Sequence, residues 1–272
     1  MDSQFGGKRW IADGKGGGKW SKNPSGPKAW LKALIPLHGG SSSSVQDQAN
    51  VEGNFLGNWS LSLRWQAPEG WMVRAYYQHF FEDHSMLFFD YPWKDGLYGI
   101  EGRLPENPVV SELLYEFLYM KDQSGPVYWD HNSKIDYQVS GRDNYYNNYA
   151  YNGWQNWGQA IGNPLLTSPI YKANHRMGFL STRIISNHFG FKGEPSKQVA
   201  YRVLLSHTRS WGTYENPFPK VKSDFSWLAE VKYHPEKLKG WEASFSLAGD
   251  HGSLLGNSFG GMLSISKTGW FK

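Results

Sequence analysis

One segment of the chain gathers the residue types best suited to binding a sugar. From Arg142 to Trp157 the sequence interleaves Tyr and Trp with Asn, and adds one Arg and one Asp. Aromatic faces stack on the apolar C–H faces of pyranose rings, while Asn, Asp and Arg side chains hydrogen-bond to hydroxyl groups. The candidate binding residues are Arg142, Asp143, Asn144, Tyr145, Tyr146, Asn147, Asn148, Tyr149, Trp154 and Trp157. The alternative for each aromatic residue is that it packs against its neighbours and folds the segment.

A pair of carboxylates offers a second kind of chemistry. If Glu112 and Glu116 lie in one strand, they point the same way and are roughly 13 Å apart, at about 3.3 Å per residue. That separation exceeds the roughly 6.5–9.5 Å between the two carboxyl groups of an inverting glycosidase. We therefore expect these two glutamates to pair with Arg and Lys side chains.

Metal-ligating residue types occur without a recognisable metal motif. His79 and His84 bracket two acidic residues, and the long polar segment holds a second group, Asp130, His131, Asp136 and Asp143. Solvated loop residues account for both groups better than a metal site does. The chain has no Cys and shows no nucleophile elbow, phosphate loop or zinc motif. The sequence predicts no catalytic residue, no metal and no cofactor; a barrel enzyme acting on lipid or glycan is the weaker alternative.

The elements that must position these residues are strands. From residue 57 the hydrophobic period becomes two: Trp59, Leu61, Leu63 and Trp65 alternate with Ser60, Ser62, Arg64 and Gln66. The same alternation recurs to the C-terminus and predicts nine strands of roughly 8 to 13 residues, near the length that crosses a bilayer. One face of each strand is apolar and the other is wet.

The connections alternate between tight and long. The tight ones carry Pro and Glu, at 67–70, 105–108, 194–197 and 234–237, and the long ones are predicted at 82–96, 121–181, 211–224 and 250–257. Short periplasmic turns and long extracellular loops are typical of outer-membrane barrels. A soluble β-sandwich also has alternating strands, but the aromatic residues near strand ends favour the membrane. The predicted fold is an all-β antiparallel transmembrane β-barrel with long extracellular loops.

Residues 1–56 differ in composition from residues 57–272. They are loop-like, with glycine-rich and serine-rich stretches, and we expect a strand stub, an extracellular loop and a short helix over 25–35. Ser25 is the expected N-cap, and Pro27 suits the first turn. The first residues lack the basic and apolar regions of a signal peptide. Because a barrel of this kind must be exported, we expect that the true N-terminus of the protein is missing from this chain.

Composition excludes several classes of protein. The 272 residues carry a net charge of +4 with no Lys/Arg run of the nucleic-acid-binding kind. Mean hydropathy is −0.59, and no apolar run approaches the roughly 18 residues of a membrane-spanning helix. Aromatic residues make up 17% of the chain, which suits an aromatic-rich β-protein.

Three groups of segments resemble one family. Asp143–Tyr149 with Gly153-Trp154, Ile161–Tyr171, and the stretches Phe5–Trp10 and Asp95–Glu101 are similar to the capsule assembly Wzi family of outer-membrane proteins, in its Bacteroidetes form. The resemblance spans nearly the whole chain. It implies a monomeric barrel of roughly eighteen strands in the bacterial outer membrane. It also implies that the protein binds capsular polysaccharide at the cell surface, is not an enzyme, and helps to assemble or anchor the capsule.

The predicted strands match the second half of such a barrel. Nine is an odd number, and closed single-chain bacterial barrels have even numbers, so we expect a truncated chain whose edges do not close alone. The expected partners are capsular polysaccharide and outer-membrane lipid, with no nucleic acid. The charged strand faces leave an alternative function open, that of an outer-membrane porin or transport barrel.

Overall fold

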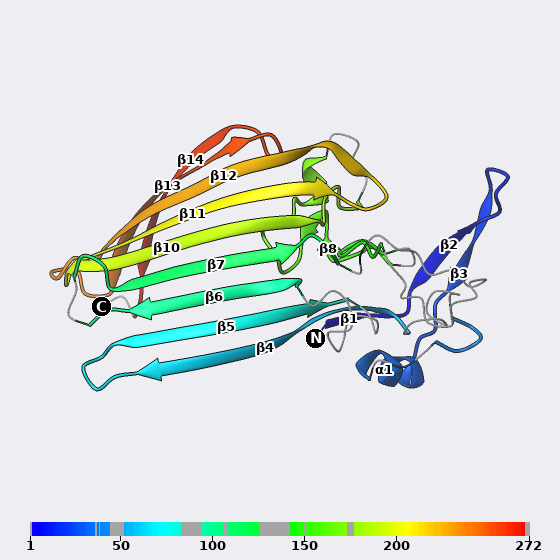
Figure 1. Ribbon diagram of the computed structural model, residues 1–272, viewed down its shortest axis with the longest axis horizontal. Helices are drawn as coiled ribbons and strands as arrows, with labels where there is room; N and C mark the ends of the chain where they lie inside the picture. The colour runs from blue at the N-terminus through cyan, green and yellow to red at the C-terminus, as the bar shows by residue number, and fades with distance from the viewer. Residues whose placement is uncertain are drawn as a thin grey trace.

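One antiparallel sheet dominates the protein (Figure 1). The computed structural model describes residues 2–35, 37, 39–43, 52–82, 94–105, 108–123, 125, 142–148, 151–172 and 177–269. The ten strands of the sheet lie in the order β1 (Asp2–Gln4), β4 (Asn54–Gln66), β5 (Met72–Phe81), β6 (Gly96–Arg103), β7 (Glu112–Met120), β10 (Ile184–Ser196), β11 (Val199–Gly212), β12 (Pro217–Tyr233), β13 (Trp241–Gly252) and β14 (Ser258–Lys267). The nine strands from β4 onward correspond to the nine that the sequence predicts.

The sheet is a meander, because almost every strand pairs with the next one in the chain. The exceptions are the β1–β4 pair, whose connection holds β2, β3 and α1, and the β7–β10 pair, whose connection holds the long polar segment. Among the described residues, β14 hydrogen-bonds to β13 alone, and β4 beyond Leu56 hydrogen-bonds to β5 alone. The described sheet is therefore open and does not close into a barrel, as an odd set of nine long strands predicts.

The turns at one end of the sheet, here called the tight-turn end, follow the prediction in part. Gly70 has a φ of 90° and its N–H donates to the Ala67 carbonyl, which closes the first turn. At the third turn, however, Glu194 and Pro195 belong to β10, with a register shift between Gly193 and Ser196. Pro cannot donate to the ladder, so it occupies a bulge here instead of a turn.

The opposite end, here called the long-loop end, also departs from the prediction. The predicted loop at 211–224 is wrong: β11 and β12 extend as a two-stranded ribbon, and only residues 213–216 connect them. The prolines and lysines of 217–222 look loop-like in sequence, but the segment is extended, and its two ends pair with β11 at Pro217–Gly212 and Lys222–Ser210. The connection at 250–257 likewise shortens to 253–257, so only the first two long connections are long.

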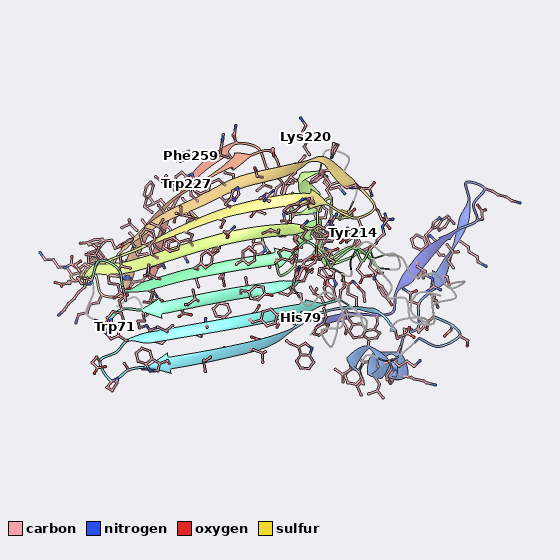
Figure 2. All side chains as sticks on the ribbon, viewed as in Figure 1. Trp71, His79, Tyr214, Lys220, Trp227 and Phe259 are labelled. Carbon is pink, nitrogen blue, oxygen red and sulfur yellow. The ribbon has the colours of Figure 1, made fainter. Side chains whose placement is uncertain are left out.

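The two faces of the sheet differ as the alternation predicts. The outer face carries exposed apolar side chains from edge to edge: Leu61, Leu63, Trp65, Val73, Ile100, Tyr115, Phe189, Phe225, Val231, Phe245, Phe259, Leu263 and Ile265. The inner face carries Ser, Arg, Glu, His and Lys. Figure 2 shows side chains standing on both faces, with Trp71 at the tight-turn end and His79 toward the other end.

Residues 2–35 contain more regular structure than their composition suggests. After β1, a hairpin forms from β2 (Lys8–Ala12) and β3 (Gly18–Lys22), followed by α1 (Pro27–Leu34). The predicted helix is present with Pro27 in its first turn, but Gly26, and not Ser25, is the N-cap. Gly26 has a φ of 97°, a conformation that Ser would adopt only with strain.

The main core lies between the long loop and the inner side of the sheet. Strand residues Leu118, Met120 and Ile184 pack there against loop residues that include Tyr145 and Leu166. A second, smaller cluster joins Ala33 of α1 to Phe55 of β4. Within the described ranges the helical segments are α1 and the 3-10 turn η2 (Pro169–Tyr171), and neither has the length or apolar content of a membrane-spanning helix.

Candidate functional site

The aromatic segment folds back onto the sheet, and three of its predicted binding residues become core. Tyr145, Tyr146 and Trp154 are at most 4% exposed. Tyr146 packs edge-on against Phe179, with ring centroids 5.3 Å apart, and its hydroxyl accepts a hydrogen bond from the Asn163 N–H at 3.0 Å. The rings of these three residues hold the loop on the sheet and present no open face to a ligand in this structure.

The predicted asparagines fasten the loop from within. The Asn147 side chain makes three hydrogen bonds to two other residues. Its Nδ2 donates to Asn144 Oδ1 and to the Phe179 carbonyl, and its Oδ1 accepts from the Phe179 N–H. Asn148 Nδ2 donates to Asn54 Oδ1 on β4, and its Oδ1 accepts from the Tyr151 N–H. These amides are half-buried, and their polar atoms fix the path of the backbone.

The remaining predicted residues lie at the ends of the segment. Arg142 has a φ of 65°, and its Nη2 donates to the Tyr214 carbonyl at 3.1 Å, which ties the loop to the β11–β12 connection. Asp143 is half-buried beside it. Tyr149 lies outside the described residues.

Trp157 is placed quite differently. It occupies the tip of a small hairpin formed by β8 (Gln155–Asn156) and β9 (Gln159–Ala160), and its side chain is 86% exposed. Trp157 and Gly158 have φ values of 50° and 80°, the two left-handed residues of a type I′ turn. A bulky residue is uncommon in that conformation. The turn holds the indole away from the core with both faces open.

A second exposed aromatic side chain lies beside this tip. The Ile170 N–H donates to the Gly158 carbonyl at 2.9 Å, so η2 is fixed against the turn, and the next residue, Tyr171, is 73% exposed. We call Trp157, Ile170 and Tyr171 the aromatic tip. The sequence analysis missed Tyr171 as a site residue, although it lies within a segment singled out for its family resemblance.

A cavity of about 520 Å³ lies under the loop, against the inner face of the sheet. Its loop side includes Tyr145, Tyr146 and Asn163, and its sheet side is part apolar and part polar. The polar sheet residues are Asn58, Gln78, Glu116, Ser186, His188 and Ser206. The loop covers the inner face of the sheet but leaves a partly enclosed cavity, and the sheet side of this cavity, its floor, carries hydrogen-bonding groups.

Glu116, His188 and Ser206 lie side by side on three adjacent strands of that floor. His188 Nδ1 lies 2.7 Å from Ser206 Oγ. The Glu116 carboxylate accepts a hydrogen bond from the Tyr76 hydroxyl, two strands away. Tyr76 reaches it by lying across Gly99, where any Cβ would overlap the ring.

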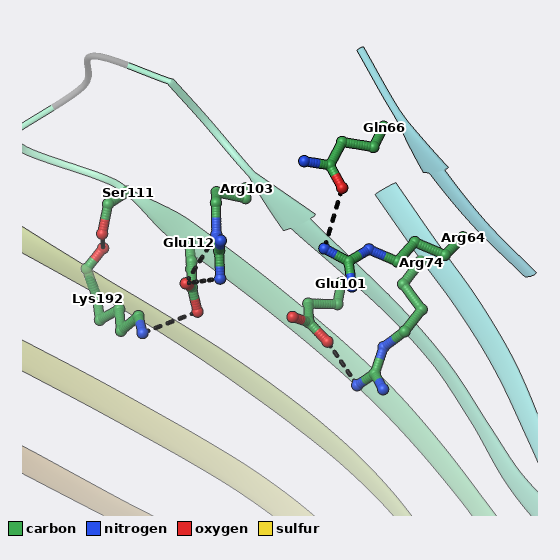
Figure 3. A network of polar contacts seen from close by, with 8 residues as sticks. All are labelled: Arg64, Gln66, Arg74, Glu101, Arg103, Ser111, Glu112 and Lys192. Carbon is green, nitrogen blue, oxygen red and sulfur yellow. Dashed lines mark hydrogen bonds and ion pairs between the residues drawn. The ribbon is translucent and has the colours of Figure 1, made fainter. Parts of the chain in front are cut away.

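Glu112 behaves as predicted, and Glu116 does not. Figure 3 shows the Glu112 carboxylate between Arg103, at 3.0 Å, and Lys192, at 2.9 Å. Arg74 and Glu101 form a similar pair at 2.5 Å. Among the described residues Glu116 has no cationic partner, so its expected pairing with Arg or Lys is wrong. The reason is the glycine at 99, which opens a path for Tyr76 that no local pattern reveals.

Asp95 anchors the start of the long connection. Its carboxylate is fully buried and accepts hydrogen bonds from the backbone N–H groups of Gln123, at 2.6 Å, and Asp122, at 3.3 Å. Burial raises the pKa of the Asp95 carboxyl to about 8, although the two N–H donors act to lower it. Asp95 is therefore a structural clamp at the long-loop end, and burial of its charge makes the ionised form costly there.

The remaining candidates add no site. His79 is buried, and its Nδ1 lies 3.2 Å from the Asp95 carbonyl. His84, Asp130, His131 and Asp136 lie outside the described residues. Within the described part of the chain, no three His, Asp, Glu or Cys side chains are grouped as a metal site requires.

Comparisons of the chain with protein-family models, with curated proteins and with solved structures found no match. The features of the structure that bear on function are the aromatic tip, the cavity and the two faces of the sheet.

Proposed function

We propose that the chain belongs to a bacterial outer-membrane β-barrel that resembles the capsule assembly Wzi family. It binds capsular polysaccharide at the cell surface with its long-loop end and helps to assemble or anchor the capsule, without catalysing a reaction. The outer face of the sheet faces lipid in this proposal, and the loops face the capsule.

The contrast between the two faces supports the membrane part of the proposal. Soluble monomers rarely expose a contiguous apolar patch larger than a few hundred Å². Here the exposed apolar side chains of the outer face extend from β4 to β14, while the inner face carries ion pairs such as Arg202–Glu230. An apolar exterior with a polar interior is the pattern of outer-membrane barrels.

The open edges add a requirement. In lipid, each unpaired backbone N–H or C=O group costs on the order of several kcal/mol. We therefore propose that in the membrane further strands pair with β4 and with β14 to complete a barrel of roughly eighteen strands, which acts as a monomer. Its lipid partner in this proposal is the outer membrane.

The aromatic tip is the observation that carries the glycan part of the proposal. Its two exposed rings are held by a left-handed turn and by the η2 contact. A ring held rigidly in water loses little entropy when a sugar stacks on it.

Affinity electrophoresis of the purified protein through gels containing its host's capsular polysaccharide tests this function. We expect retardation of the wild type and a clear loss with Trp157→Ala combined with Tyr171→Ala. The exposed outer-face variant Leu63→Ala serves as the control and should keep wild-type retardation. If the wild type migrates alike with and without the polysaccharide, the proposed binding function is wrong.

Transport is the second candidate, and the charged inner face favours it. Rings of ion-paired side chains line many aqueous pores. The long loop, however, packs against the inner face through Tyr145, Leu166 and Phe179. Planar-bilayer conductance of the completed barrel separates the two functions: steady ion currents support a pore, and a sealed bilayer supports the binding protein.

A further inference from the structure

The positive charge of the protein is concentrated in one hairpin. Residues 8–22 hold five of the 28 basic residues and one of the 24 acidic ones. The other 23 basic and 23 acidic residues cancel, so the net charge of +4 belongs to this hairpin alone. We call β2, β3 and their turn the hairpin arm.

The charges of the hairpin arm are uncompensated locally. Lys8, Lys15, Lys19 and Lys22 are exposed, and none of them has an ion-pair partner among the described residues. The one acid, Asp13, accepts hydrogen bonds from two backbone N–H groups of its own turn. Lys8 and Lys22 are direct cross-strand partners, and like charges so placed destabilise a pair of strands.

Two tryptophans lie on the same face as Lys8 and Lys22. Trp10 and Trp20 are cross-strand partners whose rings meet edge-on at 5.5 Å, and they are 47% and 66% exposed. The Trp10 ring lies over Gly18, where any Cβ would overlap it. An isolated two-stranded sheet is marginally stable, and here the indole pair supplies its packing. One face of the hairpin arm thus presents a pair of indoles next to a pair of lysines.

The hairpin arm is fixed to the same end of the molecule as the aromatic loop. Arg9 Nη1 and the Gly6 and Gly7 carbonyls hydrogen-bond to Asn23, which fastens the base of the arm. In β1, just before the arm, Gln4 Nε2 donates to the Gly153 carbonyl of the loop. Figure 1 shows β2 and β3 projecting beyond the long-loop end of the sheet.

We propose that the hairpin arm is a second binding site, and that it recognises the carboxylates of an acidic polysaccharide. The lysines attract the carboxylates and the indoles stack on the sugar rings between them. This inference rests on the proposed function and assigns the chemical class of its ligand. A lipid headgroup fits less well, because the arm projects beyond the long-loop end of the sheet and so lies past the apolar side chains of its outer face. The aromatic tip then binds sugar rings without regard to charge.

The experiment measures binding of the detergent-solubilised full chain to immobilised polymers at low and at high salt. The polymers are the host's purified capsular polysaccharide, the same polysaccharide after chemical reduction of its carboxyl groups, and vesicles containing lipopolysaccharide. The test variant is Lys8→Gln, Lys19→Gln and Lys22→Gln together. Its control removes the same charge from exposed lysines at the tight-turn end, with Lys197→Gln, Lys237→Gln and Lys239→Gln.

We expect the test variant to lose about tenfold or more in affinity for the native polysaccharide at low salt, a loss that salt diminishes. The wild type should bind the carboxyl-reduced polymer as weakly as the test variant does, and the control variant should match the wild type. Trp10→Ala with Trp20→Ala should weaken binding to both forms of the polymer, which shows that the arm itself makes contact.

Each other outcome is decisive. If wild type and test variant bind the native polysaccharide equally, the inference is overturned while the proposed function stands. A variant that loses binding to the lipopolysaccharide vesicles alone assigns the arm to lipid phosphate and also overturns the inference. If the wild type binds neither form of the polysaccharide, the proposed function itself has failed.

Discussion

The long loop and the hairpin arm are both rich in aromatic residues, yet they use them in opposite ways. In the loop, Tyr145, Tyr146 and Trp154 are buried in the core cluster that the loop forms with apolar residues on the inner face of the sheet. In the described part of the hairpin arm, Trp10 and Trp20 pack on each other and the Trp10 ring lies over Gly18, yet both indoles remain exposed. An aromatic residue therefore becomes core where the fold supplies an apolar partner, and it stays available for binding where the fold supplies none.

Substituting two tryptophans of the loop sharpens this comparison most strongly. Trp154 is 4% exposed and Trp157 is 86% exposed, although they are three positions apart. Trp154→Ala should destabilise the protein by about 3–5 kcal/mol, and Trp157→Ala by less than about 0.5 kcal/mol. Urea unfolding in detergent, followed by intrinsic fluorescence and by limited proteolysis of the loop, measures both. Similar losses in the two variants would break the comparison.

Glycines with positive φ provide the next test. Gly153 has a φ of 72°, and any Cβ there would overlap the Tyr146 carbonyl oxygen, whereas Gly16 in the hairpin arm has a φ of 88° and open space around it. Gly153→Ala should cost roughly 2–4 kcal/mol through strain and overlap, and Gly16→Ala only about 1 kcal/mol through strain. The urea midpoint of the main sheet should therefore fall for Gly153→Ala and stay constant for Gly16→Ala, because the arm packs on itself. Equal midpoints would show that the loop yields as easily as the arm.

The pH dependence of stability tests the clamp at the start of the loop. The folded-state pKa of Asp95, about 8, lies above the roughly 3.9 of an unfolded Asp, so the neutral carboxyl favours the folded state. That contribution is complete below about pH 4 and is lost as the pH rises toward about 8. Between these pH values the urea midpoint of the wild type should fall relative to that of Asp95→Asn. Parallel pH profiles would contradict the raised pKa.

The smallest effect belongs to the hairpin arm. Trp20→Ala removes an edge-on aromatic pair worth about 0.5–1.5 kcal/mol. Because the arm packs on itself, the loss should abolish the exciton signal of the indole pair in circular dichroism while the unfolding midpoint of the main sheet stays constant. A shifted midpoint would mean that the arm is part of the cooperative core, like the loop.

Much of the sheet could be predicted from the sequence, because the relevant information is local. The alternation of Trp59, Leu61 and Leu63 with serines fixes which side chains share a face, and the nine predicted strands are present. Errors occurred where local composition opposed a long-range partner. Residues 217–222 were predicted as part of a loop, but they are an extended part of β12 whose ends pair with β11.

The candidate site could be predicted less well. The segment Arg142–Trp157 was found from its composition, but composition treats Trp154 and Trp157 alike. The structure separates them, because Trp154 meets the core cluster and Trp157 lies at a left-handed turn. The hairpin arm was missed because its glycine-rich turn suggested a flexible loop, although Trp10 and Trp20 flank that turn symmetrically and could have indicated a hairpin.

By itself, then, the sequence determined the β-class, the strand positions and the polarity of each face, because a period of two is a property of neighbouring residues. Only the tertiary structure decided which aromatic rings are buried, that Tyr76 reaches Glu116 across Gly99, and that the charge of the chain projects from one end. Those outcomes depend on contacts between residues far apart in the chain. The spacing of residues along the sequence does not encode such contacts.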